Sequence, residues 1–335
     1  MAEAVELEVA GRTVRLSNPD KVYYPERGFT KADVAHYFLT VAEGALRALR
    51  DRPTTLQRFP DGVAGEFFYQ KRAPKGRPDW LPTARIAFPS GRYADEICPT
   101  EPAAVLWAVN LGCLTFHPWP VRRDAPEHPD ELRIDLDPQP GTDFADAVRA
   151  AHELHALLDE YGLTGWPKTS GGRGLHVFVP IEPRWTFTDC RFAVIALARE
   201  LEQRLPGRVT SKWWKEERGS RIFVDYNQMA RDRTIASAYS LRNRPGATVS
   251  TPLRWEELDD AAPEDFDLLS VARRYAELGD VHDRMDSRRF SLDGLLDLYE
   301  RQRRDSGEAD LPYPPDHPKA AGEPTRVQPS RARDR

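Results

Sequence analysis

The chain has 335 residues, 40% of them hydrophobic and 30% charged, which is typical of a soluble globular protein with one large domain or two moderate ones. Its apolar runs are far shorter than the roughly 20 residues of a membrane-spanning helix, its N-terminus lacks a signal-peptide pattern, and its three widely spaced cysteines exclude a disulfide framework, so we expect a cytoplasmic protein. The formal net charge of −5 is unevenly distributed, because residues 47–77 and 208–244 are basic whereas residues 256–300 carry fourteen acids against five arginines. The basic segments could form patches that bind nucleic acid, or they could be ordinary solvent-exposed surface; both interpretations stay open.

The first part of the chain, to about residue 130, mixes strands, a helix and loops. Alternating apolar and polar residues between Leu7 and Leu16 predict a hairpin. A helix is expected over residues 30–49, because Thr30 can cap it, Asp33 follows three residues later and apolar residues then recur on one face. Pro and Gly punctuate residues 53–82, which predicts loops and short strands of the kind that often carry binding residues.

From residue 132 onward, predicted strands and helices alternate. Strands are expected at 132–136, near Trp166, at 175–180 and at 221–225, and helices at 143–161 (ended by Gly162), at 188–205 and after Leu268. This alternation predicts a mixed α/β fold, in which a central sheet is flanked by helices and short strands add antiparallel pairs. The polar, Pro-rich residues 306–335 predict a disordered tail.

Two carboxylates two residues apart end a predicted apolar strand, in Ile134-Asp135-Leu136-Asp137-Pro138. Period-two geometry puts both on one face, where a divalent cation would relieve their repulsion, because Mg²⁺ prefers hard oxygen ligands. Asp225, at the end of the strand at 221–225, is the best candidate for the third ligand of a two-metal site. Aspartate also forms turns at strand ends, so this motif alone leaves a structural role open.

A glycine-rich segment, Ser170-Gly171-Gly172-Arg173-Gly174-Leu175-His176, lies between two predicted strands. Glycines let backbone N–H groups converge on an anion, and Arg173 and His176 add charge or donors, so a triphosphate is a suitable ligand. The segment is not a P-loop, because no Gly-Lys-Ser/Thr follows and the next element is a strand. A tight hairpin turn with a packed His176 remains the alternative.

Two further sets of side chains could bind nucleic acid or phosphate. Four arginines follow Asp225, namely Arg231, Arg233, Arg242 and Arg244, and guanidinium groups bind phosphates bidentately. An aromatic run, Phe67-Phe68-Tyr69, sits between Arg58 and Lys71-Arg72, which suits base stacking beside a phosphate backbone. Solvent-exposed arginines and core-packed phenylalanines are the alternatives.

Taken in order, these motifs resemble the archaeo-eukaryotic primase superfamily, and most closely the polymerase domain of bacterial DNA ligase D. The resemblance covers residues 18–298 and rests on motifs that run from Asn18-Pro19-Asp20-Lys21 through Phe67 to Lys71, Asn110-Leu111-Gly112, Asp135 to Pro138, Ser170 to His176, and Tyr239 to Arg242. It implies one primase-polymerase domain over residues 1–305, with DNA-end-binding elements in about residues 1–130 and the catalytic core in about 131–300. This family domain is commonly fused to a ligase, but the chain ends instead in a polar tail, so we expect a stand-alone paralogue.

The resemblance and the motifs together assign roles to individual residues. Asp135, Asp137 and Asp225 would bind two Mn²⁺ or Mg²⁺ ions. Asn18, Lys21 and Lys31 would bind a DNA 5′-phosphate, and Phe67 or Phe68 would stack on the template. The incoming NTP or dNTP would be bound by Arg58, His117, Ser170, Gly171, Arg173, Gly174, His176, Arg233, Arg242 and Arg244.

The resemblance implies a template-directed nucleotidyltransferase that fills short gaps in DNA repair or end joining and readily inserts ribonucleotides. Its partners would be gapped or broken DNA, the Ku protein and a separate DNA ligase, at the nucleoid of a bacterial cell. Three alternatives stay open. One is a primase that starts chains de novo, and another is a non-catalytic module that binds DNA ends and recruits a ligase or Ku. The third, an unrelated metal-dependent phosphohydrolase, rests on the Asp135 and Asp137 pair alone.

Overall fold

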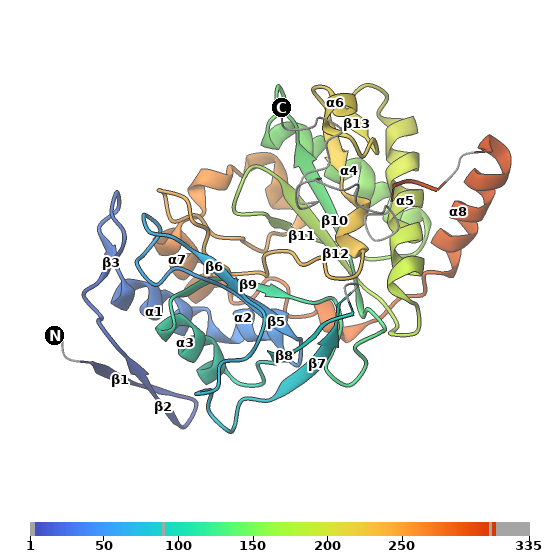
Figure 1. Cartoon of the computed structure of the whole chain (residues 1–335). Helices are drawn as coiled ribbons and strands as arrows, with labels where there is room; N and C mark the ends of the chain where they lie inside the picture. The colour runs from blue at the N-terminus through green and yellow to red at the C-terminus, as the bar shows by residue number, and fades with distance from the viewer. Residues whose placement is uncertain (1–3, 89–90, 308–309, 313–335) are drawn as a thin grey trace, which may run out of the picture. The chain divides into compact units, whose positions relative to one another are not determined.

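The computed structural model describes residues 4–88, 91–307 and 310–312. By internal contacts the chain divides into two compact units (Figure 1). Unit 1 comprises Met1–Pro126, Lys168–Gly172 and Thr234–Ser287, and unit 2 comprises Glu127–Pro167, Arg173–Arg233 and Arg288–Arg335. Within the described residues, no helix has the length and apolar character needed to cross a membrane.

The described residues of unit 1 form three sheets. The predicted hairpin is confirmed as β1 (Val5–Val9) and β2 (Arg12–Leu16), which pair antiparallel, and a second small hairpin joins β3 (Val22–Tyr24) to β4 (Phe29–Thr30). The largest sheet has the order β6-β5-β8-β7, with β9 also paired to β5. Its strands are β5 (Thr54–Arg58), β6 (Phe68–Gln70), β7 (Thr83–Ala87), β8 (Tyr93–Ile97) and β9 (Cys113–Pro118).

The helix predicted over residues 30–49 is two helices, α1 (Lys31–Thr40) and α2 (Ala42–Leu49). The predicted cap is present, because the Thr30 hydroxyl accepts from the Asp33 N–H and the Asp33 carboxylate accepts from the Thr30 N–H. Val41 separates the two helices, and in the first turn of α2, where N–H groups have no intrahelical acceptor, the Gly44 N–H donates to the Tyr275 hydroxyl at 3.0 Å. The other helical segments of unit 1 are α3 (Pro102–Asn110), η2 (Trp255–Asp260), η3 (Pro263–Asp265), α7 (Leu268–Leu278) and η4 (Met285–Ser287).

Unit 2 is built on a sheet of order β11-β12-β10-β14-β13, of which β11 begins in this unit. The strands are β10 (Glu131–Pro138), β11 (Trp166–Thr169), β12 (Leu175–Pro180), β13 (Val209–Thr210) and β14 (Ile222–Val224). β10 pairs antiparallel with both β12 and β14, whereas β13 and β14 are parallel. The mixed α/β class with added antiparallel pairs is therefore confirmed.

Helices of unit 2 pack against this sheet and against each other (Figure 1). α4 (Phe144–Glu160) and α5 (Phe187–Arg204) both begin with a capping box, at Asp143 and Thr186 respectively, and Gly162, with φ of 67°, follows α4. α8 (Asp293–Ser306) lies beside α5, where the rings of Phe192 and Tyr299 stack at 4.4 Å. Two short helices, α6 (Lys215–Arg218) and η1 (Tyr226–Met229), flank β14 in the sequence.

The tail predicted at residues 306–335 lies largely outside the described residues. Its described part includes residues 310–312, which contact unit 2 through the Asp310 carboxylate and the backbone carbonyls of Leu311 and Pro312.

Candidate active site

The three predicted metal-binding acids are carried by neighbouring strands of unit 2. Asp135 and Asp137 alternate with the fully buried Ile134 and Leu136 on β10, so both half-buried carboxylates emerge on one face. Asp225 directly follows β14, and its N–H donates to the Asp135 carbonyl at 3.0 Å. The antiparallel pairing of β10 and β14 thus brings the third acid to the first two.

Two polar side chains hold Asp135. The Gln228 amide Nε2 lies 3.3 Å from Asp135 Oδ2 and also 3.3 Å from Asp225 Oδ2, so one amide donates to both carboxylates. On the other side, His176 is the Cα partner of Asp135 across the β10–β12 ladder, and its Nε2 lies 3.5 Å from Asp135 Oδ1. His176 was predicted from the sequence, whereas Gln228 was not, because its position three residues after Asp225 is the only sign of its role.

Asp137 is held by a second chain of contacts that the sequence did not reveal. Gln139 Nε2 donates to Asp137 Oδ2 at 3.0 Å, and Gln139 Oε1 accepts from Arg218 Nη1 at 3.3 Å. The Arg218 side chain is buried, and its guanidinium lies 3.5 Å from the centre of the Phe223 ring. A buried positive charge is therefore connected to Asp137 through one amide.

Burial controls the ionisation of these acids. It raises the pKa of Asp137, against the hydrogen bond from Gln139 and the charges of Arg218, Arg173 and Lys215. It also raises the pKa of Asp225, where Arg233 and Arg218 oppose the rise and the charge of Asp137 adds to it. A bound cation would stabilise both ionised forms, because burial and like charge both disfavour them.

The donor set suits a hard divalent cation. Asp135, Asp137 and Asp225 supply carboxylate oxygens, the ligands that Mg²⁺ and Mn²⁺ prefer, and nearby cationic side chains keep the site from being purely acidic. Over the described part of the chain, no three His, Cys, Asp or Glu side chains are already grouped as in a formed metal site. The acids fit such an ion by chemistry and by strand placement.

The glycine-rich segment crosses from unit 1 to unit 2 between Gly172 and Arg173. On the unit 2 side, a Cβ at Gly174 would lie 2.7 Å from the Leu136 carbonyl oxygen, so only glycine lets β12 begin this close to β10. Exposed Arg173 donates from Nη2 to the Pro138 carbonyl at 3.1 Å. Arg173 and His176 thus belong to the same sheet as the acids, and Arg233 contributes positive charge at Asp225.

On the unit 1 side, the same segment meets the predicted arginines. The Ser170 hydroxyl accepts from the Gly172 N–H at 3.0 Å. A Cβ at Gly171, where φ is +67°, would lie 2.6 Å from Arg242 Cγ, and one at Gly172 would lie 3.4 Å from Arg244 Nη2. Ser170, Arg242 and Arg244 are therefore gathered at one place. Arg231 is engaged elsewhere, in an ion pair with Glu127.

A second cationic group of unit 1 surrounds Lys31. Its ammonium donates to the backbone carbonyls and side-chain oxygens of Ser17 and Asn110, at 2.7 to 3.3 Å. Burial, followed by the charges of Lys21 and Arg58, lowers the pKa of Lys31 to about 8. The Lys21 ammonium contacts the Asp61 carboxylate at 2.5 Å, and the Lys21 backbone N–H donates to the backbone carbonyl of exposed Asn18.

The predicted aromatic cluster lies on the surface of unit 1. Phe67 and Phe68 are each 45% exposed, and the Arg58 guanidinium lies 5.0 Å from the centre of the Phe68 ring. Arg58 also donates to the Gln70 amide oxygen at 2.6 Å. His117 is buried on β9, where its Nε2 lies 3.1 Å from Gln57 Oε1 and its ring contacts Tyr69. Phe67 packs on the buried Phe59 with ring centres 5.2 Å apart, yet Phe67 and Phe68 both stay 45% exposed, so base stacking remains a prediction beside core packing.

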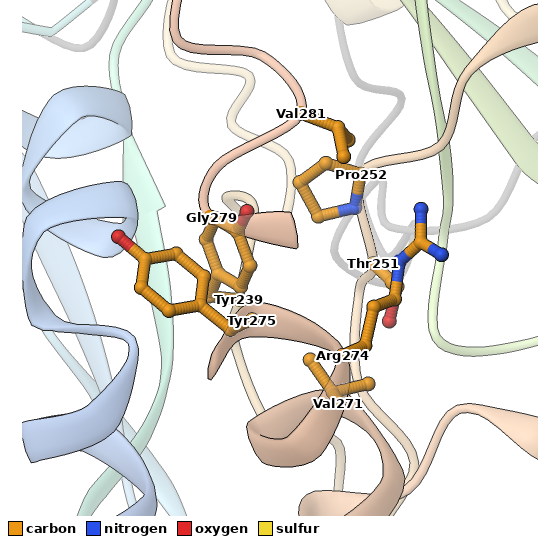
Figure 2. Close-up of a pocket in the computed structure, with 8 residues that line it drawn as sticks. All are labelled: Tyr239, Thr251, Pro252, Val271, Arg274, Tyr275, Gly279 and Val281. Atoms are coloured by element: carbon orange, nitrogen blue, oxygen red, sulfur yellow. The ribbon is translucent and has the colours of Figure 1, made fainter. Parts of the chain in front are cut away.

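A small pocket in unit 1 is separate from all these residues (Figure 2). It has no interior space for a water molecule, and the rings of Tyr239 and Tyr275 lie edge to face beside it with their centres 5.4 Å apart. Its walls are formed by Tyr239, Thr251, Pro252, Val271, Arg274, Tyr275, Gly279 and Val281. None of these was a predicted site residue.

Comparisons with known proteins show the family of this chain. A family model described as the LigD primase-polymerase domain matches residues 30–282. The end-joining protein LigD of Mycolicibacterium smegmatis is 33% identical over 308 residues, 91% of this chain and 40% of that protein. LigD of Bacillus subtilis is 31% identical over 268 residues, 79% of this chain and 43% of that protein. The chain therefore spans about two fifths of the length of these relatives.

Among solved structures, the polymerase domain of Mycobacterium tuberculosis ligase D in complex with DNA is similar, with a TM-score of 0.78 and 33% identity. The match covers 83% of this chain and 99% of that one. The family expected from the motifs and the nucleotidyltransferase class that goes with it are both confirmed: this chain belongs to the LigD primase-polymerase domain family.

Proposed function

We propose that this chain is a template-directed nucleotidyltransferase that fills short gaps in DNA during repair or end joining, and that it accepts ribonucleotides. One observation carries the proposal: in a chain of a polymerase family, the Gln228 amide donates to the carboxylates of both Asp135 and Asp225. Asp137 lies two residues from Asp135 on β10, so three acids are brought together. The names of its relatives refer to non-homologous end joining, and the similar solved domain is bound to DNA.

The acids would hold two Mn²⁺ or Mg²⁺ ions. When bound, such ions activate an attacking hydroxyl and stabilise a leaving pyrophosphate. The chain's own residues orient the ligands: His176 and Gln228 fix Asp135, and Gln139 fixes Asp137. Arg173, Arg233 and His176 in unit 2, and Ser170, Gly171, Arg242 and Arg244 in unit 1, are two groups that each suit phosphate binding.

DNA contacts would lie in unit 1. Lys31 is a buried ammonium whose acceptors are neutral oxygens, so a 5′-phosphate near Lys21 and Lys31 would supply the missing negative charge. Half-exposed Phe67 and Phe68 beside Arg58 suit stacking on a template base. Ku, a separate ligase and a cytoplasmic site of action beside the nucleoid would accompany an end-joining role.

The proposal is tested by extending a labelled primer across a short gap, with ribo- and deoxyribonucleotides, in Mn²⁺ and in Mg²⁺. Wild type should add templated nucleotides, and Asp137→Ala should lose at least about a hundredfold in rate, because a metal-binding carboxylate is removed. Asp297→Ala, which removes an exposed acid of α8, is the matched control and should extend normally.

Three outcomes would contradict the proposal. Normal extension by Asp137→Ala would exclude that acid from the site. Chain synthesis without any primer would favour the de novo primase. Tight DNA binding with no addition by the wild type under any condition would favour the recruitment module.

A further inference from the structure

A buried arginine of α5 ties residues 310–312 to the turn that carries Asp225. The side chain of Arg191 is 1% exposed. Its Nη1 lies 3.2 and 3.1 Å from the two carboxylate oxygens of Asp310, and its Nη2 donates to the Leu311 carbonyl. A guanidinium taken out of water requires such a counter-charge, so this contact is more than a surface ion pair.

The same guanidinium reaches the Asp225 turn, which we define as Asp225 and η1. Arg191 Nε donates to Asn227 Oδ1 at 2.9 Å, and Asn227 Nδ2 donates to the Pro312 carbonyl at 3.0 Å. The Asn227 side chain is thus fixed at both ends of its amide. Its backbone N–H in turn donates to Asp225 Oδ1 at 3.0 Å.

Tyr226 completes the connection. The Arg191 guanidinium lies 5.2 Å from the centre of the Tyr226 ring, and the Tyr226 hydroxyl contacts the Pro312 carbonyl at 3.4 Å. Residues 310–312 therefore contact both residues that immediately follow Asp225. The two oxygens of the Asp225 carboxylate are then held from the same turn, Oδ1 by Asn227 and Oδ2 by Gln228.

We propose that Arg191 and Asp310 are positioning residues, and that residues 310–312 close over the Asp225 turn and hold its carboxylate in the orientation that binds a divalent cation. The cation-binding part of this inference rests on the proposed function. The hold of residues 310–312 on the turn does not, because it is built from contacts that need no ligand.

Asp310→Ala in the full chain tests the inference, since the Asp310 side chain is 45% exposed and its loss leaves no buried cavity. Two quantities are measured: the dissociation constant for Mn²⁺, by titration in the absence of nucleotide and DNA, and the hydrogen-exchange rates of backbone amides. We expect Mn²⁺ to bind about tenfold more weakly, the usual effect of removing an outer partner of a ligand. Exchange of the Asn227 N–H should be faster, while exchange within β10 should stay unchanged.

Two matched variants separate positioning from general destabilisation. Asp310→Glu keeps the charge and should restore most of the Mn²⁺ affinity. Asp305→Ala removes an exposed acid of α8 and should alter neither quantity.

Unchanged Mn²⁺ affinity in Asp310→Ala, or faster exchange throughout β10, would overturn the inference, because the contact would then be merely structural. A wild-type chain that binds no Mn²⁺ would contradict the proposed function. In that case the Asn227 exchange rate still decides whether residues 310–312 hold the turn: faster exchange in Asp310→Ala supports it, and an unchanged rate overturns it.

Discussion

Lys31 combines a buried position with a charge whose acceptors, among the described residues, are neutral oxygens. The four atoms that accept from its ammonium are oxygens of Ser17 and Asn110, and the charges of Lys21 and Arg58 add to burial in lowering its pKa. Such a site stabilises the neutral amine and attracts anions. The titration of Lys31 therefore reports on the proposed 5′-phosphate site in the free protein.

The pKa of Lys31, about 8 in the folded chain against 10.5 for an ordinary lysine, predicts a pH-dependent stability. Between pH 8 and 10.5 the Lys31 amine is protonated in the unfolded chain but not in the folded chain, so folding becomes more favourable as the pH rises. Below about pH 8 the ammonium is charged in both states, and its burial then lowers the stability by the full amount. Relative to Lys31→Met, the wild type should gain about 1–3 kcal/mol of unfolding free energy across this window. Denaturant titrations at several pH values measure it.

Exposed Lys75 supplies the control for this experiment. Lys75→Met should show the same pH dependence as wild type. If the unfolding free energies of the wild type and of Lys31→Met changed equally between pH 8 and 10.5, the lowered pKa of Lys31 would be contradicted.

Gly174 predicts a second effect at the scale of a residue. An alanine there would place its Cβ 2.7 Å from the Leu136 carbonyl oxygen, which belongs to the strand backbone and cannot move away cheaply. We expect Gly174→Ala to destabilise the chain by about 1–3 kcal/mol and to reduce nucleotide addition strongly. Gly172→Ala is the matched control, because its nearest neighbours are the ends of the Ser170 and Arg244 side chains at 3.2 and 3.4 Å. Equal stability of both variants would contradict the expectation.

The sequence could predict the acids but not what holds them. Asp135 and Asp137 are visible because a two-residue period places them on one strand face, and Asp225 because it ends an apolar strand. Gln139, Arg218 and Gln228 act through the geometry of turns and of a buried guanidinium. Their spacing in the sequence contains no period, so only the folded chain reveals which carboxylate each one contacts.

At the scale of elements, the region of α1 and α2 differs from the local prediction and makes a distant contact that the sequence does not reveal. Apolar spacing and the Thr30 cap favoured one helix. The first turn of α2 is bound by Tyr275, which is 231 residues from Gly44 in the chain. Caps and strand periods are local and were therefore predictable: Thr30, Asp143 and residues 175–180 fall where expected. The division of the last helical segment into α7 and α8 was not predictable, because no change in the apolar period marks the interruption between them.

Gly44 gives the prediction at this scale. A Cβ at this position would lie 2.6 Å from Tyr239 Cε2 and 2.8 Å from Tyr275 Cε2. Although alanine favours helices over glycine by about 1 kcal/mol, we expect the clash to dominate and Gly44→Ala to lower the unfolding free energy by about 1–3 kcal/mol. Thermal unfolding measures the change.

Two companion variants separate the causes in this experiment. Tyr275→Phe should cost about 1 kcal/mol, since it removes the acceptor of the Gly44 N–H. Gly76→Ala, which meets nothing within 4 Å, should be near neutral. A Gly44→Ala variant more stable than wild type would show that the tyrosine rings move aside.

At the scale of the whole molecule, the sequence conceals which segments share a compact unit. Unit 1 collects residues from three separate stretches of the chain, including the five residues Lys168–Gly172. Composition could not reveal this, because such assignments depend on long-range packing. The uneven charge was visible, however, and it bears on DNA binding by a chain whose net charge is −5.

DNA binding should follow the local charge and not the net charge. The affinity is expected to fall steeply with salt, and Lys21→Ala should reduce the slope of log K against log salt by about 1, the value for one lost phosphate contact. Exposed Arg273, within the acidic residues 256–300, is the control: Arg273→Ala should leave the slope unchanged. Binding measured at several salt concentrations tests this, and equal slopes for wild type and Lys21→Ala would place Lys21 outside the DNA contact.

The pairing of His176 with Asp135 across the β10–β12 ladder also limits how chain length can vary during evolution. Inserting or deleting one residue between Gly174 and His176 would turn the imidazole to the opposite face of the sheet. Length changes on the other side of Gly174, before Ser170, would leave the ladder intact. Alignments of related chains should therefore place their gaps outside residues 174–180, and libraries that vary loop length can use the same boundary to separate tolerated insertions from inactivating ones.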